Sequence, residues 1–137
     1  MKLIAFLVSA GSVALLGCAG LALFSQAPKP QPLMLPLQCP GGYCTLLQGA
    51  PQTSGMRSGM VRLKAGESIG EHTTGKNEES LVILHGQGEA RIEGHPPIPF
   101  TAPALVYVPT ASRHNVVNTG TELLEYVYVV APAAQAP

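Results

Sequence analysis

Glycine and proline interrupt this chain so often that the sequence argues against long helices. The 137 residues include 15 glycines and 13 prolines, and both residue types end regular elements or begin turns. The stretches between them are short, and several are rich in valine, isoleucine and tyrosine, which favour strands. No stretch after residue 45 combines helical periodicity with a helix start and a helix stop. The sequence therefore predicts an all-β domain.

Six stretches have the apolar–polar alternation or the short apolar run of a β-strand. They are residues 60–64, 81–85, 89–93, 104–109, 114–118 and 123–130. We expect the second and third to form a hairpin through the glycine-rich turn at 86–88. Residues 93–100 contain too many prolines for a central strand. Many short strands separated by turns predict a sandwich or barrel.

The N-terminal residues are expected to direct the chain out of the cytoplasm. Residues 3–24 carry no charge and are long enough to span a bilayer, and Lys2 supplies a minimal positive n-region. Leu-Leu-Gly-Cys18 resembles the lipobox of bacterial lipoproteins, in which the cysteine becomes the lipidated first residue. The alternatives are an uncleaved anchor and, less favoured, secretion after cleavage near 25–27. We expect the domain in the bacterial cell envelope, on the periplasmic side, held to the membrane through its N-terminus.

A proline-rich segment, 25–44, separates this region from the domain and is expected to be an extended spacer. It ends in Cys39 and Cys44, which flank the turn-forming Pro-Gly-Gly-Tyr. Outside the cytoplasm such a pair oxidises to a disulfide, and two free thiols are the alternative. The predicted organisation is a signal peptide or anchor at 1–24, the linker at 25–44, a β-barrel at 45–131 and a flexible tail at 132–137.

The charge distribution excludes nucleic acid as an expected partner. The formal net charge is zero and only 12% of residues are charged. All eight acidic residues lie between Glu67 and Glu125, whereas Lys2 and Lys29 precede the predicted domain. The domain is thus mildly acidic and lacks the basic patch that nucleic-acid binding requires. A nucleophile elbow, a phosphate-binding glycine loop and a dinucleotide fingerprint are also absent from the sequence.

Two histidines and one carboxylate are the candidate metal ligands: His72, His114 and either Glu79 or Glu78. Such a set can hold one divalent ion and leave positions open for water or substrate. In an extended strand Glu79 shares a face with residues 81 and 83, which places it at the polar end of an apolar row.

The spacing around these residues resembles the two motifs of the cupin superfamily. The first motif is Gly, five residues, His, one residue, His, three or four residues, Glu, six residues, Gly. Here it is matched by Gly66, His72, Thr74, Glu79 and Gly86. The second motif is Pro, one residue, Gly, two residues, His, three residues, Asn. Here it is matched by Pro109, Ala111, His114 and Asn118.

Three positions depart from the family pattern. Thr74 stands where the second metal-binding histidine usually stands, and it could coordinate weakly through its hydroxyl or hold a metal-bound water. Ala111 replaces a glycine, and Pro103 stands where a motif-opening glycine would. The last two departures affect turn geometry, whereas the first bears on chemistry.

The resemblance implies a small cupin-type double-stranded β-helix, or jelly-roll, barrel. Its interior would bring His72, Glu79, His114 and Thr74 to one divalent metal ion, with Fe, Mn, Ni, Zn and Co all compatible. An empty barrel with hydrogen-bonded polar residues is the alternative. Glu78 could act as an acid or base beside the metal, replace Glu79 as the ligand, or face solvent.

Other polar residues are weaker candidates. His85 and His95 are expected at the surface, and so is Glu71. Arg57 could bind a carboxylate or phosphate of a ligand, but a surface or structural role is favoured. The tyrosines at 107, 126 and 128 are expected to pack in strands.

The sequence therefore supports two functions. The first is a membrane-tethered metal-binding cupin that acts on a small polar molecule by metal-centred or acid–base chemistry, as an isomerase, lyase or dioxygenase. The second is a non-catalytic module that binds a small molecule or metal in the cell envelope. A homodimer is expected, with the strand at 123–130 as a candidate contact if it lies at a sheet edge.

Overall fold

The computed structural model describes residues 29–134, and within this range the chain forms nine strands and no helix. The all-β prediction is thereby confirmed. The predicted signal or anchor at 1–24 and half of the predicted tail lie outside the described residues. Between residues 29 and 134 no helix has the length and hydropathy needed to cross a membrane.

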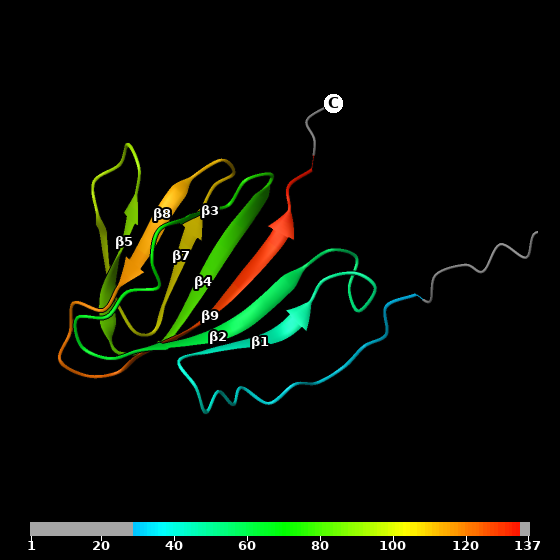
Figure 1. Ribbon diagram of the computed structural model, residues 1–137, viewed down its shortest axis with the longest axis horizontal. Coiled ribbons are helices and arrows are strands. Elements are labelled where there is room, and N and C mark those ends of the chain that lie inside the picture. Colours follow the sequence, from blue (N-terminus) through cyan, green and yellow to red (C-terminus); the bar gives the residue numbers. More distant parts are fainter. Residues whose placement is uncertain (1–28, 135–137) are drawn as a thin grey trace, which may run out of the picture.

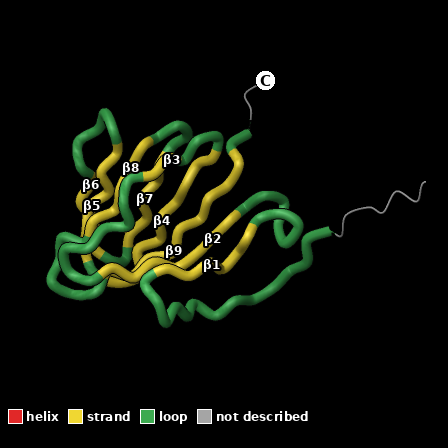
Figure 2. Tube along the Cα trace, viewed as in Figure 1, coloured by secondary structure: helices red, strands yellow, loops and turns green. Residues whose placement is uncertain are grey.

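The strands form two antiparallel sheets that face each other (Figures 1 and 2). The larger sheet has the order β1 (Tyr43–Gln48), β2 (Arg57–Leu63), β9 (Leu124–Pro132), β4 (Asn77–His85) and β7 (Ala104–Val108). The smaller sheet has the order β3 (His72–Thr73), β8 (Arg113–Val117), β5 (Gln87–Ile92) and β6 (Ile98–Thr101). This arrangement is the double-stranded β-helix that the sequence predicts.

The core lies between the two sheets because alternate residues of each strand point inward. One buried cluster contains residues of both sheets. Its members are Leu81 and Ile83 from β4, Val61 and Leu63 from β2, Leu124 and Tyr126 from β9, and Ala90, Phe100, Val106 and Val116. Four of its members, Val61, Leu81, Val116 and Tyr126, also line the cavity described below. The apolar core is therefore the floor of the cavity.

The hairpin predicted across residues 86–88 is wrong. β4 pairs with β7 and β9, whereas β5 pairs with β6 and β8, so the turn at Gly86 carries the chain from one sheet to the other. Gly86 has a φ of +81°, and a Cβ there would lie 2.6 Å from the carbonyl oxygen of Leu123. A glycine-rich turn predicts a change of direction, but it does not specify whether the flanking strands pair.

The order of the strands shows which of them lie at the edge of a sheet. β6 lies at the end of its sheet, as expected for a strand that contains Pro99. β9 lies between β2 and β4 and is hydrogen-bonded on both sides. Residues 123–130 therefore do not lie at a sheet edge, which was the condition for a dimer contact there, and the homodimer stays a prediction. A dimer that forms by strand pairing would have to use an outer strand, such as β1 or β7.

The predicted disulfide between Cys39 and Cys44 is confirmed, with Cα atoms 5.5 Å apart. Cys39 is buried, and its carbonyl accepts a hydrogen bond from Nη1 of Arg62 at 3.1 Å. The same guanidinium pairs with Glu125 at 2.7 Å. β1 begins at Tyr43 rather than at residue 45, so the end of the predicted linker is bound to the barrel.

The loop before β8 contains one strained residue, which gives the first testable prediction. Ala111 has a φ of +55°, the only positive φ of a non-glycine residue in the part of the chain that the structure describes. A left-handed L-residue costs about 1–2 kcal/mol, and glycine loses about 0.4–1 kcal/mol more entropy on folding. We therefore expect Ala111→Gly to raise the free energy of unfolding by about 0.5–1 kcal/mol in chemical denaturation.

The matched control is Ala65→Gly, at an exposed turn residue without a positive φ. It should destabilise the protein slightly because only the entropic cost applies. Equal destabilisation by both substitutions would contradict the strain at Ala111.

Candidate metal centre

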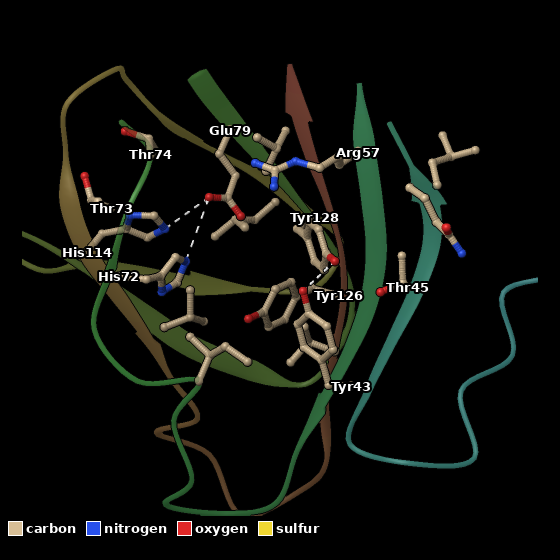
Figure 3. A pocket seen from close by; sticks show the side chains of 17 residues that line it. Tyr43, Thr45, Arg57, His72, Thr73, Thr74, Glu79, His114, Tyr126 and Tyr128 are labelled. Carbon is tan, nitrogen blue, oxygen red and sulfur yellow. Dashed lines mark hydrogen bonds and ion pairs between the residues drawn. The ribbon is translucent and has the colours of Figure 1, made fainter. Parts of the chain in front are cut away.

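A cavity of about 450 Å³ opens between the two sheets. Its walls come from strands β1, β2, β4 and β9 of the larger sheet and from β3 and β8 of the smaller one. Figure 3 shows the two histidines on one side of this cavity, the tyrosines on the other, and Glu79 and Arg57 above them. Its size is that of a site for a small molecule.

Two imidazoles meet because two short strands pair across the cavity wall. His72 in β3 lies directly opposite His114 in β8, and directly opposite residues of an antiparallel pair point to the same face. Their ring centroids are 4.2 Å apart. His114 is fully buried, whereas the side chain of His72 is 42% exposed and faces the mouth of the cavity.

The carboxylate of Glu79 reaches the same point from β4 in the opposite sheet. Its Oε2 lies 3.2 Å from Nε2 of His114 and 4.0 Å from Nε2 of His72 (Figure 3). One ligand atom from each of the three residues lies within 4.8 Å of the other two. Of the two adjacent glutamates, the structure therefore brings Glu79 to the histidines.

The tautomers of both histidines are those of metal ligands. Nδ1 of His72 lies 2.9 Å from the carbonyl oxygen of Gly70, and Nδ1 of His114 lies 3.3 Å from that of Ser112. A carbonyl oxygen only accepts hydrogen bonds, so each Nδ1 carries the proton. Each Nε2 then presents its lone pair to the cavity, as in histidines that bind metal.

The buried Nε2 of His114 has no hydrogen-bond partner among residues 29–134. The nearby oxygen of Glu79 lies within ion-pair distance but outside hydrogen-bond geometry. A buried polar atom without a partner costs about 1–3 kcal/mol, and a divalent ion between the three residues would remove that cost. The residues present therefore fit a divalent metal ion.

Protonation competes with a metal for the same nitrogen. Burial lowers the pKa of His114, but the Glu79 carboxylate and the Ser112 carbonyl favour the imidazolium more strongly, so the pKa is raised above its ordinary value. A metal ligand must be deprotonated. Metal binding at this site should therefore weaken as the pH falls.

Thr74 is buried beside the site, and its hydroxyl is engaged in hydrogen bonds. Oγ1 donates to the carbonyl oxygen of Pro109 at 2.8 Å and accepts from the N–H of Ser112 at 3.0 Å. These bonds join the end of β3 to the loop that precedes β8. The geometry thus favours Thr74 as a residue that holds this loop in place, and its role as a ligand stays a prediction.

Glu78 lies away from the three ligand residues. It does not line the cavity, and its carboxylate accepts a hydrogen bond from the hydroxyl of the exposed Tyr107 at 2.9 Å. Adjacent residues of a strand point to opposite faces, so Glu79 faces inward and Glu78 faces outward. This position does not support the predicted acid–base role of Glu78 beside a metal.

The remaining motif and surface residues mostly lie where the sequence indicates. Glu71 is exposed and pairs with Arg113, and His85 and His95 are exposed. Asn118, the last residue of the second motif, is buried and donates to the carbonyls of Leu63 and Glu122. Asn118 therefore holds the turn before β9 and does not reach the cavity.

One arginine and three tyrosines line the cavity, although the sequence favoured surface or packing roles for most of them. Arg57, Tyr43, Tyr126 and Tyr128 all line the cavity. The hydroxyls of Tyr43 and Tyr128 are 2.5 Å apart, and their rings stack. Burial raises the pKa of Tyr126 and Tyr128 above the usual value for tyrosine. Both phenols are therefore neutral hydrogen-bonding groups at physiological pH.

Residues 59–130 match the sequence model of a family described as the cupin domain. This chain belongs to the cupin family. No curated protein matches the chain.

Solved structures of other cupins have the same fold. A cupin domain from Schizosaccharomyces pombe is 21% identical with a TM-score of 0.60, and the match covers 66% of this chain and 64% of that domain. A predicted oxalate decarboxylase from Thermotoga maritima is 25% identical with a TM-score of 0.61, covering 66% and 79%. An RmlC-like cupin with a double-stranded β-helix fold from Methanocaldococcus jannaschii is 20% identical with a TM-score of 0.59, covering 74% and 91%.

The position of Glu78 gives the second prediction. The hydrogen bond to the Glu78 carboxylate, with smaller contributions from burial and from the negative charge, raises the pKa of Tyr107. We expect Glu78→Gln to lower this pKa towards the ordinary value for tyrosine, because the phenolate would no longer face a carboxylate. NMR titration of the tyrosine ring carbons measures it. Glu71→Gln is the control and should leave Tyr107 unchanged, and an unchanged Tyr107 in Glu78→Gln would contradict the contact.

Proposed function

We propose that this cupin is an exported, membrane-tethered protein that holds a divalent metal ion with His72, Glu79 and His114. A small polar molecule would bind in the cavity beside the ion. The reaction would be metal-centred or acid–base chemistry of the isomerase, lyase or dioxygenase type. The observation that carries the proposal is the buried Nε2 of His114, which has no hydrogen-bond partner within residues 29–134 and faces a second imidazole and a carboxylate.

The donor set limits which ions fit. Two imidazole nitrogens and one carboxylate oxygen suit Fe, Mn, Ni, Zn or Co in the divalent state. Three protein ligands leave at least one position open, as in catalytic metal sites. An ion held there would supply Lewis acidity and, for iron or manganese, redox chemistry. The exposed side of His72 lies at the cavity mouth, so a small molecule can reach this position.

The other residues of the chain bind and orient the ligand. Tyr126 and Tyr128 stay protonated, so their hydroxyls can donate hydrogen bonds to ligand oxygens. The carbonyls of Gly70 and Ser112 fix the two imidazole rings. Apolar residues of the floor, such as Leu81 and Val116, exclude water from the inner end of the cavity.

A non-catalytic binding module is the second candidate, and a specific observation favours it. Among the residues described at the cavity wall, Glu79 is the only carboxylate, and it is also the proposed metal ligand. Glu78 faces outward, so the cavity contains no further carboxylate for proton transfer.

Turnover of sugars or oxo-acids by the metal-loaded protein, with oxygen uptake followed in parallel, would support the enzyme. Binding without turnover would support the module.

Metal content is the decisive measurement for the site. The full-length chain, purified in detergent without chelator, should contain close to one divalent ion per chain by elemental analysis. His72→Ala, His114→Ala and Glu79→Gln should each lower metal affinity by at least about 100-fold, because each removes a direct ligand. Glu78→Gln should bind as the wild type does.

The control is His85→Ala, which removes an exposed imidazole whose Nδ1 bonds only the backbone at Leu123. Metal retained in the three ligand variants would contradict the site. A wild-type protein that stays metal-free after reconstitution would overturn the metal proposal and leave an empty binding barrel.

Export and tethering are proposed from residues 1–24, with Cys18 as the lipidation site. The rest of the proposed organisation is a linker at 25–44, the barrel at 45–131 and a tail at 132–137. The Cys39–Cys44 disulfide supports this proposal, because such bonds persist outside the cytoplasm. Metabolic labelling with a fatty acid in a bacterial host should mark the wild type and not Cys18→Ser. Membrane association without labelling in both proteins would support an uncleaved anchor, and protein found only in the soluble periplasmic fraction would overturn tethering.

A further inference from the structure

Arg57 differs from the other arginines in that its guanidinium has no partner among residues 29–134. Arg62 pairs with Glu125, Arg91 with Glu89 and Arg113 with Glu71. The guanidinium of Arg57 forms neither a hydrogen bond nor an ion pair with any residue that the structure describes, and the side chain lines the cavity. A guanidinium that is left free at the wall of a cavity is available to a ligand.

Strand register places Arg57 in line with the metal centre. Arg57 of β2 pairs with Val130 of β9, and Val130 pairs with Glu79 of β4. The three residues form one row across three strands, and all three side chains line the cavity. Neighbouring strands are about 4.8 Å apart, so the backbones at Arg57 and Glu79 are separated by about 10 Å. No ion pair joins Arg57 to Glu79 in the described part of the chain, and the space between them lies within the cavity (Figure 3).

The aliphatic stem of Arg57 is held at this position by the neighbouring loop. A Cβ at Gly49 would lie 3.3 Å from Cγ of Arg57, a close contact that would require the stem to shift slightly. Gly49 also has a φ of +89°, which favours glycine at this position. The loop after β1 thus lies beside the stem of the arginine.

The charges of the cavity favour an anion. Among the residues described at the cavity wall, Arg57 is the only arginine or lysine and Glu79 is the only carboxylate. A divalent ion at the proposed site would add positive charge that no further carboxylate of this wall offsets, and a bound cation is the largest local charge in such a site. Apolar side chains and tyrosine hydroxyls make up much of the remaining wall.

We propose that Arg57 is the anion-binding residue of the cavity and that the ligand is a small carboxylic acid with a second polar oxygen. Its carboxylate would pair with the guanidinium, and the second oxygen would face His72, Glu79 and His114. The second contact rests on the proposed metal site, whereas the first does not. A carboxylate fits better than a phosphate, because neither a lysine nor a second arginine lines the described cavity wall to help neutralise the additional charge of a phosphate.

The test uses lactate as the probe and lactamide as its uncharged analogue. The full-length chain, in detergent and loaded with Co(II), is titrated by calorimetry, and the visible spectrum of Co(II) reports whether the metal site is intact. Arg57→Gln should weaken lactate binding by about 10- to 100-fold at unchanged cobalt content and spectrum. Arg57→Lys should give an intermediate loss, because it keeps the charge but not the fork. Lactamide should bind wild type and Arg57→Gln equally weakly.

Arg91→Gln is the matched control, because Arg91 lies on the surface and pairs only with Glu89. It should bind lactate as the wild type does. Equal lactate affinity in wild type and Arg57→Gln, equal affinity of the wild type for lactate and lactamide, or no lactate binding at all would overturn the proposal. Binding of inorganic phosphate in preference to lactate would overturn the carboxylate assignment.

A failure of the metal site is distinguishable from a failure of this inference. The same titrations on metal-free protein test the guanidinium alone, since Arg57 lies outside the ligand set. Binding of lactate to metal-free wild type that is lost in Arg57→Gln would support the inference even if no metal is bound. His114→Ala should lose cobalt in every case in which the metal site is correct.

Discussion

Pairing of β9 with β2 on one side and β4 on the other is the constraint on which the rest of the structure depends. It fixes which residues of the larger sheet face inward, because the side-chain period of a strand is two. The inward residues of β9 run from Leu124 and Tyr126 in the core to Tyr128 and Val130 at the cavity. A shift of register by one residue would turn the tyrosines outward and would separate Arg57 from the row that contains Glu79.

The ligand residues of the proposed metal centre stand on strands of very different length and pairing. Glu79 stands on β4, a long strand with partners on both sides, whereas His72 stands on β3, which has two residues and one partner. The position of His72 therefore depends on contacts outside its strand. Hydrogen bonds of Thr74 to Pro109 and Ser112, together with the Glu71–Arg113 pair, hold β3 against β8. In this chain a threonine stands where the family motif has a histidine, and a loop contact stands where that motif would place a further ligand.

Alternation along the strands predicts a β-sandwich or β-barrel, because it depends on local period alone. The cupin barrel and the choice of Glu79 over Glu78 followed from the spacing of the two motifs, with which the strand parity of Glu79 agrees. Strand pairing could not be predicted in the same way. The turn at Gly86 has the composition of a hairpin turn. The chain nevertheless passes there from the larger to the smaller sheet, because β4 pairs with β9 and β5 pairs with β8. Arg57 has no motif and precedes the first predicted strand. Its place in the same cross-strand row as Glu79 follows from a register across three strands, which no local pattern contains.

The disulfide connects the proposed location of the protein to the integrity of its cavity. β1 is an edge strand paired only with β2, yet Tyr43 and Thr45 of this strand form part of the cavity wall. The Cys39–Cys44 bond closes the turn before β1, and a loop this short contributes about 2 kcal/mol by the loop-entropy estimate. In a reducing compartment the turn would keep the contact of the Arg62 guanidinium with the Cys39 carbonyl, the hydrogen bond from the Arg62 N–H to the Gly42 carbonyl and the backbone pairing of β1. The stacked pair of Tyr43 and Tyr128 would then be less firmly held, so an oxidising environment favours the cavity in the form that binds a ligand.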